Sequence, residues 1–188
     1  MANQKYTSIQ NDYSIVFDKN STIEQVPNDT SIQQQAFCFI SLAEINEFES
    51  MRTIDGIGVV TFVGPSAQVS VKHLQNTVKD RRNLVIAEES GLCITVSLWG
   101  ANATLSYEVG QVLALKGARV SDYNGKSLNS GDEHSQVFVN PENKRAQELR
   151  KWWEVSGLKG VQELRSMSGG SLNLMASAPQ KSHAAPFE

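Results

Sequence analysis

The sequence RRNLVIAEESGLCITVSLWG, residues 81–100, is typical of two β-strands joined by a short turn. Both halves are rich in Val, Ile and Leu, and Ser90-Gly91 between them is a common turn pair. Trp99 stands where the second strand gives way to Gly100. The hairpin therefore raises the question of whether Trp99 is a core residue or an exposed platform for stacking.

Similar strand signals surround this hairpin, from about Phe37 to Val139. The other turns between them carry Gly64-Pro65, Asn124-Gly125 and Gly131-Asp132. Many short strands in one domain favour a small barrel or sandwich. A short helix is expected near ANATLSY, residues 101–107, between the SLWG strand and the strand QVLALKGARV.

The segments on either side of the strands follow different patterns. Residues 1–36 read as an extended lead-in and a polar connector, and residues 37–157 as the folded domain. After Asn140-Pro141, apolar residues at helical spacing predict one amphipathic helix. Its adjacent Trp152 and Trp153 lie roughly 100° apart, so one should pack under the barrel and the other be partly exposed. Residues 158–188 are rich in Ser, Ala, Gly and Pro, which predicts a flexible linker or tail.

Charge is unevenly distributed over the 188 residues, although the formal net charge is only −3. Residues 1–50 carry two basic and seven acidic side chains, so the remainder is mildly basic. Cys38 and Cys93 form no motif for zinc or for a disulfide framework, and we expect buried free thiols in a reducing compartment. No apolar run reaches the ~20 residues of a membrane span, and the N-terminus lacks a signal-peptide pattern. A soluble, intracellular protein is expected.

Enzymatic signatures are missing from the sequence. The motifs GxxxxGK[ST], GxSxG and HExxH do not occur, and His73, His134 and His183 are far apart. The pair Glu88-Glu89 precedes a turn and is better explained as a solvated loop than as a general acid and base. We therefore expect no enzymatic activity, no metal site and no cofactor.

Basic and aromatic residues form the one constellation that indicates a function. Residues 72–82 hold four basic side chains against Asp80 alone, and further ones surround the Asn-Gly turn at 124–125. Aromatic faces stack on bases at ~1–3 kcal/mol each while cations follow the backbone, as in single-strand grooves. Considered alone, the loop at residues 72–82 is better explained as an ordinary charged surface hairpin. Considered alone, Trp99 is better explained as a core residue. The residues concerned are Lys72, Lys79, Arg81, Arg82, Trp99, Arg119, Tyr123 and Lys126.

At these positions the chain resembles the large subunit of eukaryotic replication protein A, specifically its second DNA-binding OB domain. The matching motifs, in the family's order, are DRRNLVIAEESG, ITVSLWG, VLALKGARVSDYNGKSL and VFVNPENKRAQELRKWWEVSG. The resemblance covers about residues 5–165. It implies an all-β, five-stranded Greek-key OB barrel with a C-terminal helix. It also implies that residues 1–36 comprise the end of a preceding OB domain and the interdomain linker, and that the tail leads toward a further domain.

The resemblance assigns groove positions residue by residue. Trp99 and Tyr123 look like the two stacking residues, although the family usually has Phe at the second position. Ser97, Arg119, Ser121 and Arg81 also fall on groove-facing positions of the family, whereas Lys72 and Lys79 lie in a loop whose length differs by about one residue.

The resulting hypothesis is sequence-tolerant binding of single-stranded DNA by stacking and electrostatics, in replication, repair and recombination in the nucleus. Other domains and subunits of replication protein A are the implied partners, with no membrane. Two alternatives remain open: a paralogue specialised for telomeric G-rich strands, and an OB domain used for protein interaction. The full predicted site comprises Trp99, Tyr123, Arg81, Arg82, Lys72, Lys79, Ser97, Arg119, Ser121 and Lys126.

Overall fold

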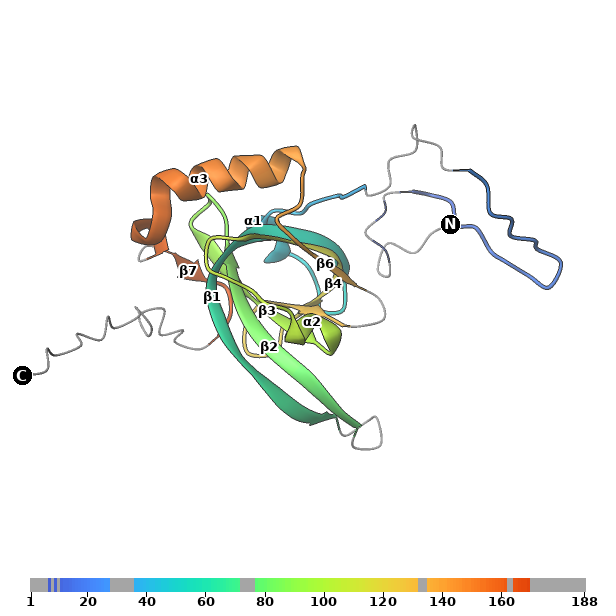
Figure 1. Cartoon of the computed structure of the whole chain (residues 1–188), viewed down its shortest axis with the longest axis horizontal. Coiled ribbons are helices and arrows are strands. Elements are labelled where there is room, and N and C mark those ends of the chain that lie inside the picture. Colours follow the sequence, from blue (N-terminus) through green and yellow to red (C-terminus); the bar gives the residue numbers. More distant parts are fainter. Residues whose placement is uncertain are drawn as a thin grey trace, which may run out of the picture.

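The computed structural model describes residues 7, 9, 11–27, 36–71, 77–131, 135–161 and 164–169 (Figure 1). Within these ranges the elements follow one another in a single domain built on strands. They are α1 (Leu42–Ile45), β1 (Thr53–Val71), β2 (Thr77–Ala87), β3 (Leu92–Trp99), α2 (Ala101–Thr104), β4 (Val112–Ser121), β5 (Ser127–Ser130), β6 (Gln136–Val139), α3 (Lys144–Val161) and β7 (Arg165–Ser166).

Five strands close into a ring. β1 pairs with β2, β2 with β3, β3 with β5, β5 with β4, and β4 returns to β1. The β3–β5 pairing is parallel and the others are antiparallel. The ring and the helix after it confirm the predicted fold, an OB barrel with a C-terminal helix, and α2 lies after β3 as expected.

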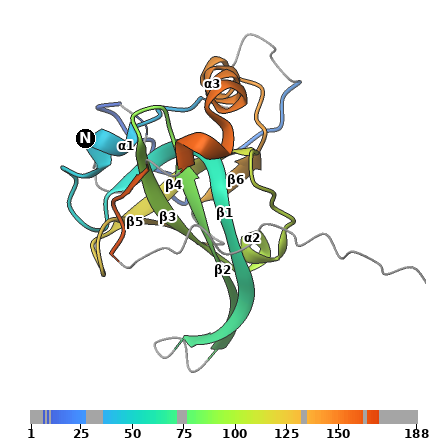
Figure 2. The same ribbon diagram turned by 90° about the vertical axis from the view of Figure 1, so that its left-hand side faces the viewer.

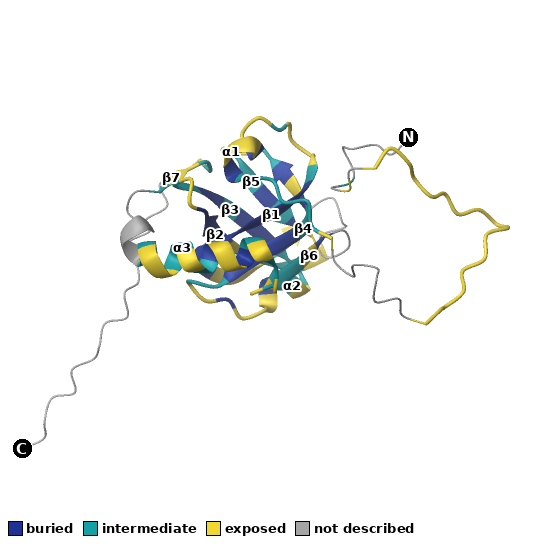
Figure 3. Cartoon of the chain, turned by 90° about the horizontal axis from the view of Figure 1, so that it is seen from above, coloured by how far each residue is buried: buried dark blue, intermediate teal, exposed yellow. Residues whose placement is uncertain are grey.

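Alternation along β2 and β3 separates the barrel interior from an outer face. Leu84 and Ile86 of β2 are fully buried, as are Ile94, Val96 and Leu98 of β3, and all five belong to the main core cluster. The neighbouring residues of each strand point to the opposite side because successive side chains alternate. Figure 3 shows the buried strands at the centre of the molecule.

The hairpin of β1 and β2 extends beyond the ring as a two-stranded arm (Figures 1 and 2). Its register runs from Ser66 opposite Arg82 to Val71 opposite Thr77, after irregularities that begin at Val60. Bulges of this kind bend a strand and increase its twist. The arm therefore carries Lys79 beyond the ring, whereas Arg81 and Arg82 still pair with β3.

A buried carboxylate fixes the chain where it enters the barrel. Asp55 is fully buried, accepts hydrogen bonds from the backbone N–H groups of Cys38 and Gly117, and forms a 2.9 Å ion pair with Lys116. Lys116 also donates to the Ala36 carbonyl at 2.6 Å. Residues 36–38 are thereby attached to β1 and β4, close to the predicted start of the domain at residue 37.

The lead-in at residues 11–27 is extended and exposed, with a turn in which Asn20 and Ser21 donate backbone hydrogen bonds to Asp18. Its large apolar side chains, such as Ile15, are mostly accessible to solvent. Among the described residues, no helix has the length and apolar character that crossing a membrane requires.

α3 covers one side of the barrel. Asn143 caps its first turn by accepting from the backbone N–H of Ala146 at 2.8 Å. Trp152 and Trp153 are both half-buried, and both pack against buried residues of the barrel. Both remain partly exposed, so the expected difference between one packed and one partly exposed tryptophan is not observed; the ring of Trp153 lies against the backbone of Gly110.

The chain does not leave the barrel after Gly157, which differs from the prediction of a tail over residues 158–188. Gly157 has a non-helical backbone with φ 46°, where the helix kinks. Beyond the kink, β7 pairs in parallel with Leu92 and Cys93 of β3. Local composition missed this strand because its pairing depends on a distant edge of β3. Residues 170–188 lie outside the described residues.

An ion-pair cluster holds α3 to the turn between β2 and β3. Arg145 donates to both carboxylate oxygens of Glu89, at 2.5 and 3.0 Å, and to the buried Glu88 at 3.3 Å. Partial burial alone would raise the pKa of the Glu89 carboxyl, but the hydrogen bonds and charge of Arg145 outweigh it and lower that pKa. The Glu88-Glu89 pair is thus part of the scaffold.

This cluster predicts acid sensitivity. Because the pKa of Glu89 is lowered by folding, its contribution to stability is present above the ordinary value of 4.5 and is lost as the pH falls through the folded-state value. We expect the free energy of unfolding, measured in urea from about pH 6 to about pH 3, to fall less steeply for Glu89→Gln than for the wild type. Glu142→Gln, at an exposed position outside the cluster, is the control. Identical slopes for all three proteins would contradict the assignment.

Candidate nucleic-acid interface

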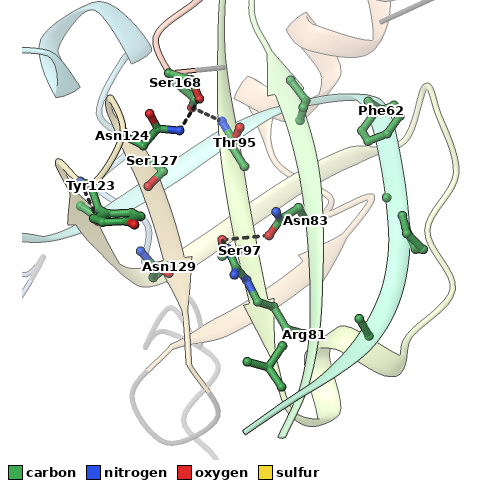
Figure 4. Close-up of a pocket in the computed structure, with 17 residues that line it drawn as sticks. Phe62, Arg81, Asn83, Thr95, Ser97, Tyr123, Asn124, Ser127, Asn129 and Ser168 are labelled. Carbon is green, nitrogen blue, oxygen red and sulfur yellow. Dashed lines mark hydrogen bonds between the residues drawn. The ribbon is translucent and has the colours of Figure 1, made fainter. Parts of the chain in front are cut away.

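A groove of about 560 Å³ runs across the outer faces of β2, β3 and β5, between the β1–β2 arm and the loop after β4 (Figure 4). Its floor is polar, with serine, threonine and asparagine side chains. One end, towards β1, is more apolar. The lining residues are Phe62, Gly64, Pro65, Ala67, Val69, Arg81, Asn83, Val85, Thr95, Ser97, Ser121, Tyr123, Asn124, Ser127, Asn129, Ser168 and Gly169.

A hydrogen-bonded set of side chains occupies the middle of the floor. Arg81 donates through Nη2 to Ser97 Oγ at 3.2 Å, and Ser97 donates to Asn83 Oδ1 at 3.0 Å (Figure 4). All three residues lie on the outer face because β2 and β3 pair Asn83 with Ser97 and Arg81 with Trp99. The Nε atom of Arg81 is buried and makes no hydrogen bond within the described structure. Its guanidinium is anchored to the groove floor through Ser97.

Trp99 lies on this outer face, which answers the question raised by the SLWG sequence. It is half-buried, its Nε1 is 3.5 Å from Asn129 Oδ1, and the Arg81 guanidinium lies 5.1 Å from the centre of a Trp99 ring. A cation at this distance from an indole is attracted to its face. The ring therefore joins the two sides of the groove floor and does not belong to the buried barrel core.

Tyr123 stands at the opposite rim, in the loop between β4 and β5. It is 90% exposed, and its backbone N–H donates to Ser121 Oγ at 3.3 Å. Figure 4 shows its ring beside Asn129, facing the groove. An exposed aromatic ring at the edge of a polar groove is available for stacking.

The structure separates the basic residues that were predicted together. Arg82 lies on the interior side of β2, between Arg81 and Asn83, and donates to the Leu105 carbonyl at 2.7 Å. Lys126 is largely buried; it pairs with Asp122 at 2.6 Å and donates to the Phe48 carbonyl. Both cations are thus engaged in holding loops.

The remaining basic residues have different positions. Lys79 lies on the arm opposite Val69, on the same side of β2 as Arg81. Arg119 is exposed and pairs with Asn129 across β4 and β5, next to the groove but outside its lining. Ser121, two residues further along β4, lines the groove. Lys72 lies outside the described residues, so its predicted role stays a prediction.

Sequence reasoning missed much of the groove floor. Asn83, Thr95, Ser127 and Asn129 are all lining residues that were not predicted. For Asn83 and Thr95 the signal was available in the alternation of β2 and β3, because every second residue from Arg81 and from Trp99 shares their face. Ser127 and Asn129 belong to β5, whose place beside β3 depends on long-range pairing. Ser168 and Gly169 carried no such signal, since they come from the segment that was predicted to be a tail.

The groove combines aromatic, cationic and amide side chains. Within the described ranges, no cluster of three His, Cys, Asp or Glu side chains is placed to hold a metal ion. The aromatic rings of Trp99 and Tyr123 suit bases, the cations of the arm suit phosphates, and the amides suit base edges.

Comparisons with known sequences identify relatives of this chain. The family described as replication protein A OB domain matches residues 42–140. The chain is 31% identical to replication factor A protein 1 of Schizosaccharomyces pombe, over 84% of its own length and 26% of the relative's. It is also 31% identical to the replication protein A 70 kDa DNA-binding subunit of Xenopus laevis, over 91% and 28% respectively. The chain thus spans about a quarter of the length of these relatives.

Solved structures share the fold. A replication protein A heterotrimer bound to single-stranded DNA matches with a TM-score of 0.67 and 24% identity, over 90% of this chain and 40% of the other. A protection-of-telomere protein in complex with single-stranded DNA matches with a TM-score of 0.51 and 17% identity, over 64% and 88%. At these identities, the likeness establishes the barrel alone.

The geometry predicts that Leu98, Trp99 and Tyr123 contribute very differently to the free energy of unfolding. Leu98→Ala removes a fully buried side chain and should cost ~2–5 kcal/mol of unfolding free energy. Tyr123→Ala should change it by no more than ~0.5 kcal/mol because the ring is exposed, and Trp99→Ala should fall between the two. Urea unfolding of the three variants measures this order. A Trp99→Ala cost equal to that of Leu98→Ala would place the indole in the core.

Proposed function

Since the chain belongs to the replication protein A OB-domain family, we propose that it binds single-stranded DNA with little sequence preference, by base stacking and phosphate neutralisation. The family is non-enzymatic, which confirms that the chain is not an enzyme. The observation that carries the proposal is the groove that Arg81 and Tyr123 line around a polar floor, with the Trp99 ring beside Arg81.

Stacking supplies the part of the binding energy that is common to all bases. Tyr123 projects its ring from one rim, and Trp99 lies at the end of β3 on the other side of Asn129. Every base has a π-face, so two such rings hold successive bases at ~1–3 kcal/mol each with little discrimination among them. The Tyr123 ring is exposed before binding, so no core packing is lost when a base stacks on it.

Phosphate neutralisation is assigned to the arm and to the neighbouring edge of β4. Arg81 and Lys79 lie on one side of β2, where the arm passes beside the groove. Arg81 is the first choice, because a guanidinium grips a phosphate with two parallel donors and Arg81 lines the groove, whereas Arg82 does not. Arg119 stands next to Asn129 and extends the basic edge. Arg82 and Lys126 contribute indirectly, through the loops they hold.

The finer identity is also proposed. The chain is assigned to the second DNA-binding OB domain of the large subunit of replication protein A, acting in replication, repair and recombination in the nucleus. The motif order around residues 81–100 and 112–128 supports this position, as do relatives named as 70 kDa DNA-binding subunits. Other domains and subunits of such a complex are the proposed partners. Residues 1–36 are proposed to comprise the end of a preceding OB domain and the interdomain linker.

One observation favours a second candidate, a domain that reads G-rich telomeric strands. Asn83 and Asn129 place two amides on the groove floor, and amides form paired hydrogen bonds with base edges. Competition between oligo-dT and a telomeric repeat for the wild-type chain separates the two functions. Similar affinities support general binding, whereas a strong preference for the repeat supports the alternative. Failure to bind either strand would favour an interaction domain.

The salt dependence of binding tests the role of Arg81. Each neutralised phosphate of a single strand adds ~0.7 to the slope of log affinity against log salt. Arg81→Ala should flatten that slope by about this amount and weaken binding to oligo-dT and to a mixed sequence alike. Arg82→Ala is the matched control, since its guanidinium lies on the opposite face of β2. An equal change in slope for both variants would contradict the assignment, because it would mean that phosphate contact does not depend on the side of β2 to which the arginine points.

Affinity measurements test the stacking residues. Trp99→Ala and Tyr123→Ala should each weaken oligo-dT binding by ~1–3 kcal/mol, because each removes one stacking partner. Tyr13→Ala is the control for Tyr123, since Tyr13 is also exposed but lies outside the groove lining. Fluorescence titration measures all three variants. Full affinity in Tyr123→Ala would remove that residue from the site.

A further inference from the structure

The segment after α3, residues 164–169, is here called the strap, and it lies between β3 and the loop that carries Tyr123. On the β3 side, Arg165 donates its backbone N–H to the Gly91 carbonyl and Met167 donates to the Cys93 carbonyl, both at 2.9 Å. β5 pairs with β3 only from Thr95 onward. The strap therefore occupies the edge of β3 that β5 leaves unpaired, and its Met167 side chain packs against the barrel core.

The other side of the strap is bonded to the loop. The Lys126 N–H donates to the Met167 carbonyl at 2.9 Å, and the Gly169 N–H donates to the Asn124 carbonyl at 2.5 Å. The Asn124 side chain returns a bond to the Gly169 carbonyl at 2.9 Å. Three hydrogen bonds thus hold the two residues that flank Gly125, immediately after Tyr123.

Ser168 joins both sides with one hydroxyl. Its Oγ accepts from the backbone N–H of Thr95 at 2.9 Å and donates to the Lys126 carbonyl at 2.5 Å. Thr95 belongs to the groove floor and Lys126 to the loop, so this hydroxyl fixes the distance between them. Ser168 and Gly169 themselves line the groove, and Figure 4 shows Ser168 beside Asn124, the residue after Tyr123.

The contact between strap and loop is too close for side chains. A Cβ on Gly125 would lie 2.2 Å from the Gly169 nitrogen, and a Cβ on Gly169 would lie 2.4 Å from the Asn124 oxygen. Gly125 also has φ +87°, in the left-handed region. Gly125 and Gly169 must therefore lack a side chain if the strap is to pack against the loop.

We propose that the strap is a positioning element that holds the Tyr123 loop in its binding-ready conformation, with Ser168 and Gly169 as the positioning residues. This inference rests on the proposed function, because it assigns the strap an effect on DNA binding through Tyr123. An unseated strap leaves the loop fixed mainly from the α1 side, through the Lys126 contact with the Phe48 carbonyl. Binding must then order the loop. The apparent affinity is the intrinsic affinity multiplied by the fraction of molecules whose loop is already in the competent conformation.

Gly169→Ala is the variant that unseats the strap without introducing a left-handed strain, since no positive φ occurs at that glycine. Gly131→Ala is the matched control, because a Cβ there meets nothing within 4 Å and φ is likewise not positive. Ser168→Ala is the second variant, which removes two hydrogen bonds and adds no atoms. Urea unfolding of the full chain verifies that each variant is folded.

Amide hydrogen exchange of the free protein provides the readout that needs no DNA. Residues 122–126 should exchange faster in Gly169→Ala and Ser168→Ala than in the wild type or in Gly131→Ala. Unchanged exchange in both strap variants would overturn the proposal. If the wild type fails to bind oligo-dT, the proposed function falls, and exchange alone then decides whether the strap holds the loop.

A double-mutant cycle with Tyr123→Ala identifies how the strap acts on binding. Gly169→Ala should raise the Kd for oligo-dT about three- to tenfold when Tyr123 is present. In the Tyr123→Ala background the same substitution should raise it by less than about twofold, since residues that act through one another are not additive. An equal loss in both backgrounds would mean that the strap affects DNA without Tyr123, and would overturn the positioning role.

Discussion

Strict alternation along the paired strands β2 and β3 is the constraint on which both the core and the groove depend. The register that places Leu84 opposite Val96 inside the barrel also places Asn83 opposite Ser97 outside it. Side chains repeat every two residues, so a slip by one would bury the polar set and expose the apolar one. The burial of Leu84, Ile86, Val96 and Leu98 therefore fixes the groove as firmly as it fixes the barrel.

The alternation of side chains along β2 also gives two adjacent arginines different contacts. Arg81 faces the groove and lies over the Trp99 ring, whereas Arg82 turns inward and donates to the Leu105 carbonyl behind α2. Their charge is identical, and only their facing differs. A basic run on a strand thus supplies about half of its cations to one ligand, while the rest stabilise the scaffold that presents them.

The sequence predicted the parts of the structure that depend on neighbouring residues. The turns at Ser90-Gly91 and Asn124-Gly125, the helix after Pro141 and most strand runs follow from local pattern. Gly64-Pro65 was expected to form a turn but lies inside β1. The charge count over residues 72–82 did not consider to which side of β2 each side chain points. Arg81 and Arg82 were therefore predicted to act together. The strap was missed for a different reason: its order comes from the distant edge of β3 and from Thr95, 73 residues before Ser168. Long-range pairing of this kind leaves little trace in local composition.

The closed ring has a consequence for the order in which the chain acquires structure as it is synthesised. The β2–β3 hairpin is local and forms as soon as Trp99 is available, but β1 gains its second neighbour only when residues 112–119 of β4 have followed. Non-local pairings form slowly. Until then β1 and β3 each present an unpaired edge, and such edges pair readily with other chains. The nascent domain is therefore most prone to misassociation after the β2–β3 hairpin has formed and before β4 closes the ring.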